Sequence, residues 1–202
     1  MTRGNRLPLV EDFYTIQGEG HQVGKPAYFI RIGGCDVGCS WCDTKFSWNP
    51  GIHPLVEIKD IVARALEYPA RAVVVTGGEP LMYNMGPLTK ALKEAGIRTF
   101  LETSGAYPLS GSWDWICLSP KKNMPPELEL FSAASELKVI ISTASDFDWA
   151  EKNAGMVYPG CLLYLQPEWS RHQQMIQEIT EYAKANPKWN ISIQAHKFMH
   201  IP

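Results

Sequence analysis

The stretch VVVTGGEP, residues 73 to 80, is a short β-rich run that ends abruptly in a turn of small and polar residues. Gly77 and Gly78 allow the backbone to approach a ligand closely, and Glu79 offers a carboxylate to a cationic group. The same residues also make a good turn, so this stretch alone does not establish a binding site. Six other runs share its β-rich character: 27–34, 98–105, 113–120, 136–142, 161–167 and 190–196.

Helical patterns lie between some of these runs. Gly96 is an expected C-terminal cap, and Ser170 and Gln173 have the spacing of a capping box. Strands that alternate with helices indicate an α/β protein with a mostly parallel sheet. Apolar residues recur at helical spacing in three segments: 55–68, 86–96 and 170–185.

Four of the strand runs end in small, polar or Gly/Pro residues, with the letters TGGEP, ETSG, LSPK and LQPE. In parallel α/β folds ligands sit at the carboxyl ends of the strands, so these ends predict one shared site. Seven strands with three or four helices are too few for a complete eightfold barrel. We therefore expect an abbreviated, partial (β/α) barrel that forms a single domain over residues 1–202.

The composition is that of an ordinary globular protein, with 45% hydrophobic and 20% charged residues. A net charge of −2 and a pI near 6.2 argue against a protein that coats nucleic acid, which would need clustered Lys and Arg. No apolar run has the length of a membrane span. The N-terminus lacks the apolar core of a secretion signal, so we expect a cytoplasmic protein.

The loop GGCDVGCSWCDT, residues 33 to 44, places three cysteines in eight positions: Cys35, Cys39 and Cys42. The chain has five cysteines, an odd number, and three of them are crowded into this loop. That pattern fits metal binding in a reducing compartment better than a disulfide framework. Glycines in the loop permit the turns with positive φ that wrapping three thiolates around one cluster requires.

A metal site that the protein closes by itself takes four ligands, and the fourth is missing from this loop. Cys117 and Cys161 lie inside apolar strand patterns, where a free cysteine is usually a small buried hydrophobe. Structural zinc needs a second Cys or His pair at matching spacing, which the chain lacks. The remaining interpretation is a [4Fe–4S] cluster with three thiolates and one open iron.

The C-x3-C-x2-C spacing, with Trp41 just before the last cysteine, resembles the signature of the radical S-adenosylmethionine (SAM) enzymes. VVVTGGEP resembles the GGE motif with which these enzymes hold the amino group of SAM. The resemblance implies a [4Fe–4S] cluster on Cys35, Cys39 and Cys42 whose open iron binds SAM. It also implies that SAM is cleaved to methionine and a 5′-deoxyadenosyl radical, which takes a hydrogen atom from the substrate.

Further stretches resemble one family in this superfamily, the 7-carboxy-7-deazaguanine synthases, nearly from end to end: FYTIQGEG, FIRIGGC, CDT, ETSG, SPK, LQP and the terminal QAHKFMHIP. The resemblance implies a carbon–nitrogen lyase of queuosine and 7-deazapurine biosynthesis. It would convert 6-carboxy-5,6,7,8-tetrahydropterin to 7-carboxy-7-deazaguanine with loss of ammonia and with SAM recycled. The resemblance further implies a homodimer and a flavodoxin or ferredoxin as electron donor.

The family resemblance also implies which residues contact SAM. In the segment 166–169 the family has a more hydroxyl-rich run, and Glu168 and Trp169 of this chain differ from it. The implied contacts come from the cysteine loop and from the ends of three strands: Trp41, Cys42, Asp43, Gly78, Glu79, Ser119, Pro120, Lys121, Gln166, Pro167, Glu168 and Trp169.

Magnesium and substrate contacts follow from the same resemblance. Thr44 would bind Mg²⁺ through its hydroxyl, a hard oxygen ligand, although as a bare residue it could equally cap the following turn. Arg31 would pair with the substrate carboxylate, because a guanidinium binds carboxylates bidentately; the alternative is that it extends to solvent. The implied substrate contacts are Ile16, Gln17, Gly18, Arg31, Thr76 and Pro202.

Two other functions stay open at this point. An activating enzyme that installs a glycyl radical on a partner protein shares the QGEG opening of this chain. A metal-binding scaffold without catalysis, such as a zinc module, would need only the cysteines. Turnover of the pterin distinguishes the first alternative, and iron and sulfide analysis distinguishes the second.

Overall fold

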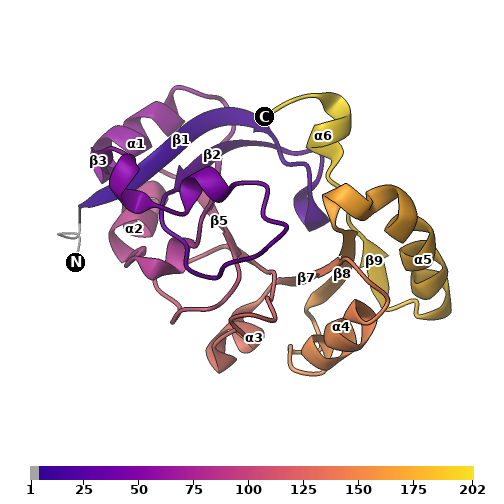
Figure 1. Cartoon of the computed structure of the whole chain (residues 1–202). Coiled ribbons are helices and arrows are strands. Elements are labelled where there is room, and N and C mark those ends of the chain that lie inside the picture. The colour runs from indigo at the N-terminus through magenta and orange to yellow at the C-terminus, as the bar shows by residue number, and fades with distance from the viewer. Residues whose placement is uncertain (1–4) are drawn as a thin grey trace.

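The computed structural model describes residues 5–202 and contains a nine-stranded sheet in the order β3-β1-β2-β4-β5-β6-β7-β8-β9 (Figure 1). β1 runs antiparallel to β2 and β3, and every other pairing in the sheet is parallel. The seven parallel strands coincide with the seven β-rich runs of the sequence, which confirms the expected sheet. The strands are Arg6–Ile16 (β1), Pro26–Ile32 (β2), Leu55–Glu57 (β3), Ala72–Gly77 (β4), Arg98–Thr103 (β5), Trp115–Leu118 (β6), Glu136–Ile141 (β7), Leu162–Pro167 (β8) and Trp189–Ile191 (β9).

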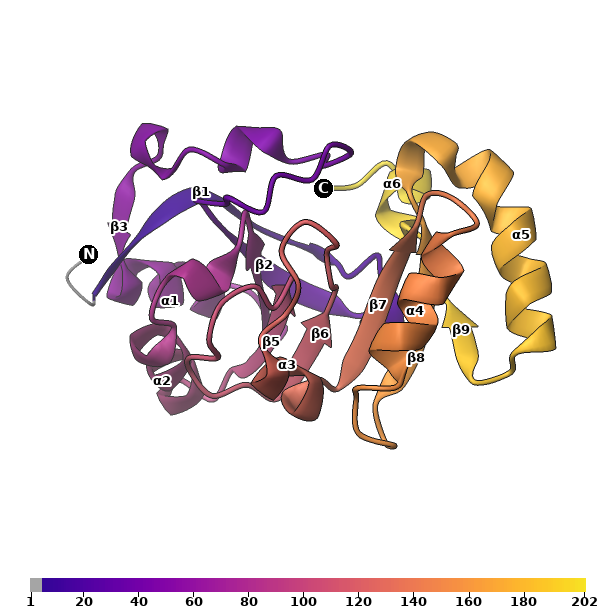
Figure 2. The same cartoon turned by 60° about the horizontal axis from the view of Figure 1, so that its bottom comes forward.

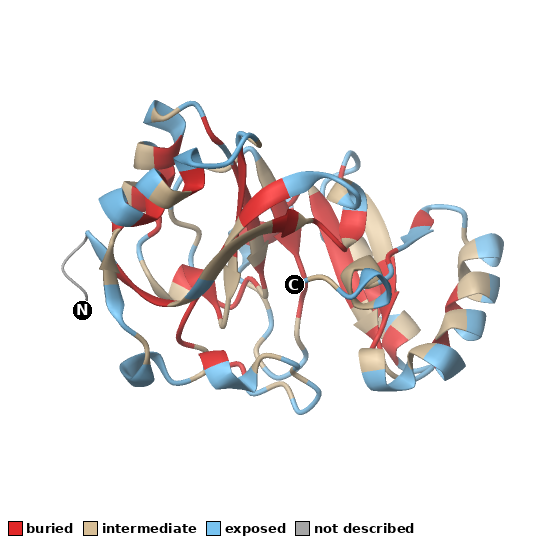
Figure 3. Ribbon diagram, turned by 90° about the horizontal axis from the view of Figure 1, so that it is seen from above, coloured by how far each residue is buried: buried red, intermediate tan, exposed pale blue. Residues whose placement is uncertain are grey.

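Five helices, α1 to α5, pack against one face of this curved sheet (Figure 2). Ile61 of α1, Leu92 of α2 and Ile179 of α5 are fully buried against strand residues such as Val75 and Leu137. The helices turn their buried residues inward and their exposed residues to solvent (Figure 3). Their bounds are Ile58–Leu66 (α1), Gly86–Glu94 (α2), Leu128–Ala133 (α3), Asp146–Ala154 (α4), His172–Ala185 (α5) and, outside this layer, Ala195–Met199 (α6).

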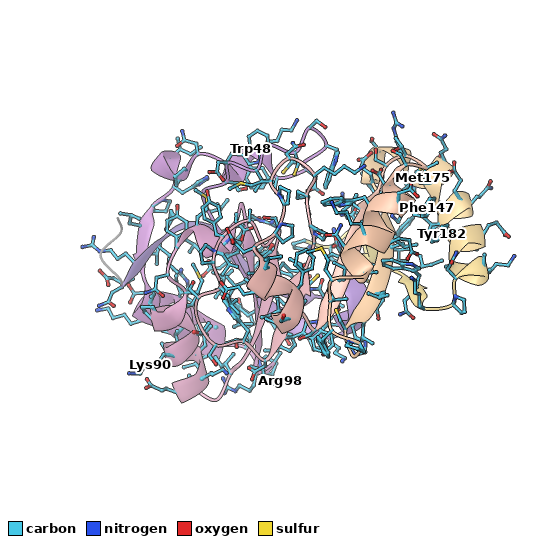
Figure 4. The ribbon with its side chains drawn as sticks, turned by 90° about the horizontal axis from the view of Figure 1, so that it is seen from below. Trp48, Lys90, Arg98, Phe147, Met175 and Tyr182 are labelled. Carbon is cyan, nitrogen blue, oxygen red and sulfur yellow. The ribbon has the colours of Figure 1, made fainter. Side chains whose placement is uncertain are left out.

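The α4–α5 contact illustrates how the helical layer is held together. The rings of Phe147 and Tyr182 stack with their centroids 4.1 Å apart, and Met175 of α5 is fully buried beside them (Figure 4). Phe147 and Trp113 are half-buried and pack against the core.

The opposite, inner face of the sheet has an apolar level and, above it, a polar level. Side chains alternate between the two faces of a strand, so residues two apart on one strand share a face. Phe100 pairs in register with Trp115 at the apolar level. Two residues further along β5, Glu102 pairs with Cys117, and Arg31 of β2 has the corresponding place beside Thr76. The carboxyl ends of the strands therefore bring polar side chains into the inner space.

Two local expectations were wrong. The residues from Leu55 to Glu57 pair with β1 as strand β3, so the first helix begins only at Ile58. The capping box fails because the Ser170 hydroxyl donates to Glu168 at 2.6 Å, and α5 begins at His172 without a side-chain cap. Gly96, in contrast, has the positive φ of +71° that the C-terminal end of α2 requires.

Candidate functional site

The cysteine loop follows β2 and is fixed at its base by the backbone. Gly34, with a φ of +113°, donates to the Ser47 carbonyl at 2.7 Å, and its own carbonyl accepts from the Glu79 amide at 2.7 Å. Cys35 donates to the carbonyl of Trp48, which is labelled in Figure 4. The loop is thus tied on one side to its own downstream segment and on the other to the GGE turn after β4. This brings the two motifs of the sequence to one place.

The arrangement of the three loop thiols fits a cluster better than a single ion. All three are free, half-buried and face one cavity. Four thiolates around one zinc ion at 2.3 Å would lie about 3.8 Å apart. In the described residues, Cys35, Cys39 and Cys42 are not among the groups whose donor atoms all lie within 4.8 Å of one another. Wider spacing of the sulfurs is what a cubane of four irons needs.

Glu79 lies at the wall of this cavity and is itself 1% exposed. One carboxylate oxygen accepts from the Thr103 hydroxyl at 2.6 Å and the Leu81 amide at 3.0 Å. The other accepts from the amide of Ser104 at 2.8 Å and from its hydroxyl at 2.5 Å. These four hydrogen bonds fix the position of the Glu79 carboxylate beside the cluster loop.

Gly78 is a second fixed point, because its Cα lies against the cysteine loop. A Cβ there would clash with the Gly34 carbonyl oxygen and would lie 2.6 Å from the Gly34 carbonyl carbon and 2.8 Å from Cys35 Cβ. Gly78→Ala is therefore expected to displace the first cluster ligand, to lower the free energy of unfolding by about 1–3 kcal/mol and to reduce retained iron severalfold. Iron analysis and urea denaturation measure both effects.

Gly155→Ala is the matched control for that substitution. The added methyl group would meet only backbone oxygens at 3.6 and 3.7 Å, which is ordinary van der Waals contact. This variant should keep the iron content of the unaltered protein. Full iron content in Gly78→Ala would show that the close approach of the two motifs is not needed to hold the cluster.

The larger cavity, about 400 Å³, opens between the cysteine loop and the carboxyl ends of β4 to β8. Pro120 is the one residue of the expected SAM set that does not line it. The members that do are Trp41, Cys42, Asp43, Gly78, Glu79, Ser119, Lys121, Gln166, Pro167, Glu168 and Trp169.

Lys121 places a cation on the wall of this cavity. Its ammonium donates to the Ser119 hydroxyl at 2.7 Å and lies 5.7 Å from the centroid of the Trp41 ring. Burial lowers the pKa of Lys121, whereas the neighbouring Cys39 acts in the opposite direction. The Glu168 carboxylate accepts hydrogen bonds from the Ser170 amide at 2.8 Å and from its hydroxyl at 2.6 Å, so it caps the turn after β8.

A smaller cavity of about 210 Å³ adjoins the first. Arg31 is 18% exposed there, and its Nε donates to Glu11 at 2.7 Å, so its guanidinium lies in the inner space and does not extend freely to solvent. The residues that line both cavities are Glu19, Asp43, Thr44, Thr76, Gly77, Glu102 and Gln194. All six residues of the expected substrate set line the smaller one: Ile16, Gln17, Gly18, Arg31, Thr76 and Pro202.

A buried ionic network lies where the two cavities meet, and the sequence reasoning missed it. The Lys138 ammonium, 5% exposed, is 2.6 Å from a Glu19 oxygen and 2.9 Å from a Glu102 oxygen. The amide groups of Gln17 and Gln194 donate to the second oxygens of Glu102 and Glu19. Two carboxylates thus share one cation. Glu19 and Glu102 belong to the sequence motifs QGEG and ETSG. The sequence around Lys138, in contrast, gives no sign that this lysine pairs with them.

The charges of this network shift its pKa values. Burial alone would raise the pKa of Glu19, but the Lys138 ammonium lowers it from 4.5 to about 2. Burial raises the pKa of Glu102 despite the same cation. The pKa of Lys138 rises well above its usual value, because the surrounding acidic groups outweigh the cost of burying the ammonium. Glu102, Cys117 and Glu136 lie within 4.8 Å of one another, and Lys138 supplies the positive charge there.

In the described part of the chain, no helix is long and apolar enough to cross a membrane.

Three thiols at the carboxyl end of a partial parallel barrel, with a GGE turn beside them, define the class of radical SAM enzymes. A family model described as "Radical SAM superfamily" matches residues 29–118. The chain is 53% identical to the 7-carboxy-7-deazaguanine synthase of Flavobacterium psychrophilum over 99% of this chain and 95% of that one. It is 47% identical to the enzyme of that name from Synechocystis sp., with coverage of 96% and 93%.

A solved structure agrees with these relatives. The crystal structure of QueE from Escherichia coli superposes with a TM-score of 0.86 and 30% identity and covers 95% of each chain. The chain belongs to the 7-carboxy-7-deazaguanine synthase family. Of the two enzyme functions left open by the sequence, this membership favours the deazaguanine synthase over the glycyl-radical activating enzyme. It also gives the protein a [4Fe–4S] cluster and SAM as cofactors.

Proposed function

We propose that this chain converts 6-carboxy-5,6,7,8-tetrahydropterin to 7-carboxy-7-deazaguanine and ammonia, by contraction of the reduced ring. The observation that carries the proposal is the pair of adjoining cavities with shared walls. One is built around three thiols and the other around Arg31, Glu102 and the C-terminal Pro202. A carboxylated molecule with several N–H donors fits the second cavity, and a cofactor bound to a cluster fits the first.

The cofactors and the chain would divide the work. When bound, the cluster and SAM would supply a 5′-deoxyadenosyl radical, which would take a hydrogen atom from C6 of the substrate and return it to the rearranged substrate radical before ammonia is lost. The chain holds the substrate beside the larger cavity and keeps water away. Ring contraction with loss of ammonia needs no net oxidant, because the product and ammonia together contain all the atoms of the substrate.

Each end of the substrate has a partner in the smaller cavity. Arg31 would pair with the carboxylate at C6, and Thr44 would place Mg²⁺ against the same carboxylate, with water completing the coordination. Glu102 and Glu19 accept hydrogen bonds only, so they suit the N–H groups of the pterin. Gln17 offers both a donor and an acceptor to its edge. These roles fix the ring with C6 toward the shared wall.

Arg31→Met tests the substrate end of the site. Losing the charged hydrogen bonds to a carboxylate, about 1.5–3 kcal/mol, should raise KM for the tetrahydropterin about 10–100-fold while the iron content stays unchanged. Arg171→Met is the control, because Arg171 contacts the Ser142 carbonyl at 3.3 Å and lines neither cavity. An unchanged KM in Arg31→Met would remove Arg31 from substrate binding.

The reaction itself is tested with reduced, reconstituted protein, SAM, Mg²⁺ and the tetrahydropterin. Ammonia and the deazapurine should form in equal amounts, and in excess over SAM if SAM is recycled. No ammonia and no deazapurine would overturn the proposal. Methionine accumulating in step with the product would overturn recycling of SAM while leaving the overall reaction in place.

The proposal also covers the compartment of the enzyme, its electron donor and its oligomeric state. The reducing conditions that free cysteines and a cluster require suit the cytoplasm. A flavodoxin or ferredoxin would supply the electron, and two chains would associate as a homodimer. Reduction of the cluster by a purified flavodoxin, and the mass of the protein in solution, are the measurements that test these points.

A further inference from the structure

The C-terminal segment, residues 194–202, closes one side of the smaller cavity. Its backbone is joined to the turn after β1 by the Ala195 amide, which donates to the Gly18 carbonyl at 2.8 Å. The Thr15 hydroxyl donates to the Pro202 carbonyl at 3.3 Å. The side-chain amide of Gln194 donates to Glu19 at 3.0 Å. In Figure 1 this segment carries α6 and ends beside the end of β1. It therefore forms a wall of the cavity assigned to the substrate.

Lys197 of this segment lines neither cavity itself but contacts two residues that line the larger one. The ammonium of Lys197, on α6, lies 2.8 Å from a carboxylate oxygen of Asp43 and 4.7 Å from the centroid of the Trp169 ring. Asp43 comes from the cysteine loop and Trp169 from the turn after β8, and both line the larger cavity. The ring of Phe198, the next residue of α6, forms a T-shaped pair with the same indole, with the ring centroids 5.5 Å apart. One cation thus joins two walls of the cofactor cavity to a wall of the substrate cavity.

Besides these side-chain contacts, α6 is held by the backbone hydrogen bond from Ala195 to Gly18. It has five residues, no side-chain hydrogen bond at its N-terminus and no fully buried residue. A helix this short is not stable by itself and depends on its tertiary contacts. The side chain of Lys197 is 19% exposed and that of Asp43 is 56% exposed, so water screens this ion pair on the Asp43 side only. The contacts of Lys197 and Phe198 therefore add to the Ala195–Gly18 hydrogen bond in fixing α6 relative to Asp43 and Trp169.

We propose that Lys197 is a positioning residue that couples the binding of SAM to the binding of the pterin, an inference that rests on the proposed function. A ligand that orders Asp43 and Trp169 fixes α6 through Lys197, and the fixed segment completes the substrate cavity. The second ligand then meets a wall that the first has already ordered, so each ligand strengthens the binding of the other. Thermodynamic linkage requires the effect to be equal in both directions.

The experiment measures the Kd of SAM on the reconstituted holoenzyme by anaerobic equilibrium dialysis, with and without saturating tetrahydropterin and Mg²⁺. The ratio of the two Kd values is the coupling factor. In the unaltered protein it should be about fivefold or more. Lys197→Met should reduce it to less than twofold. Lys197→Arg keeps the charge and the contact with the aromatic ring, so it should restore coupling.

Lys188→Met is the matched control, because Lys188 pairs with Glu151 and lines neither cavity. It should leave the coupling factor unchanged. The ratio is compared only among variants that retain iron and melt as the unaltered protein does, and Lys197→Gln replaces Lys197→Met if the latter fails to fold. Unchanged coupling in the Lys197 variant, or no coupling in the unaltered protein, overturns the inference. Absence of pterin turnover by the unaltered protein would instead overturn the proposed function.

Discussion

Replacing Cys39 by alanine should reduce the iron content of the reconstituted protein from about four atoms per chain to a small fraction of that value and abolish turnover. The reason is that only three thiols face the cavity, so none can substitute for the lost ligand. Iron and sulfide analysis, together with the visible absorbance of the cluster, measures the loss. Because the apoprotein keeps its core, its far-ultraviolet circular dichroism should be unchanged.

Cys161→Ala is the control for this prediction. Cys161 is also free, but it is buried in the hydrophobic core and does not line the cavity. The variant should lose about 1 kcal/mol of stability and retain all its iron. A brown protein with four irons per chain in Cys39→Ala, or a colourless Cys161→Ala, would contradict the assignment of the cluster ligands.

Lys138→Met should lower the free energy of unfolding at pH 7 by about 3–5 kcal/mol, because it leaves two buried carboxylates without their cation. Lys138 is 5% exposed, and Glu19 and Glu102 are 18% and 20% exposed, so water replaces the ammonium only in part. Urea denaturation of the apoprotein measures the effect. Lys184→Met is the control, because its pair with Glu181 is exposed and should contribute less than 1 kcal/mol.

The same substitution should reverse the contribution of Glu19 to the pH dependence of stability. In the unaltered protein the pKa of Glu19 is lowered from 4.5 to about 2. Its stabilising effect is therefore present above pH 4.5 and is lost as the pH falls toward 2. Without Lys138, burial raises the pKa of Glu19 as it already raises that of Glu102, so protonation favours the folded state. The cost of Lys138→Met should shrink between pH 7 and pH 4, and a constant cost would contradict this account.

The parallel part of the fold was predictable because its signals are local. Each parallel strand is a short β-rich run between turn residues. β1 was missed, since Pro8 and scattered polar residues interrupt its pattern and it pairs antiparallel at the side of the sheet. α3 was missed because six residues are too few to show helical periodicity. The first helix was predicted too long, because pairing with β1 draws the residues from Leu55 to Glu57 into a strand.

The residues of the candidate site also fall into two groups, those that local sequence motifs predict and those that depend on distant partners. Residues that lie within short motifs, such as Cys39, Gly78 and Arg31, could be named from the sequence, and the structure places them on the cavity walls. Lys138 and Lys197 could not, because their partners come from distant elements. A lysine in the apolar run ELKVIIS gives no sign of which carboxylates it will meet until the register of β5 to β7 is known.

The seven residues that line both cavities have a consequence for inhibitor design. The two spaces adjoin at Thr44 and Glu102, which line both of them. A single compound that links an adenosyl group to a carboxylated pterin by a short tether could therefore occupy both at once. Binding of one end would raise the effective concentration of the other to the millimolar range. Such a bisubstrate ligand would discriminate against other radical SAM enzymes, since they share only the adenosyl half of the space.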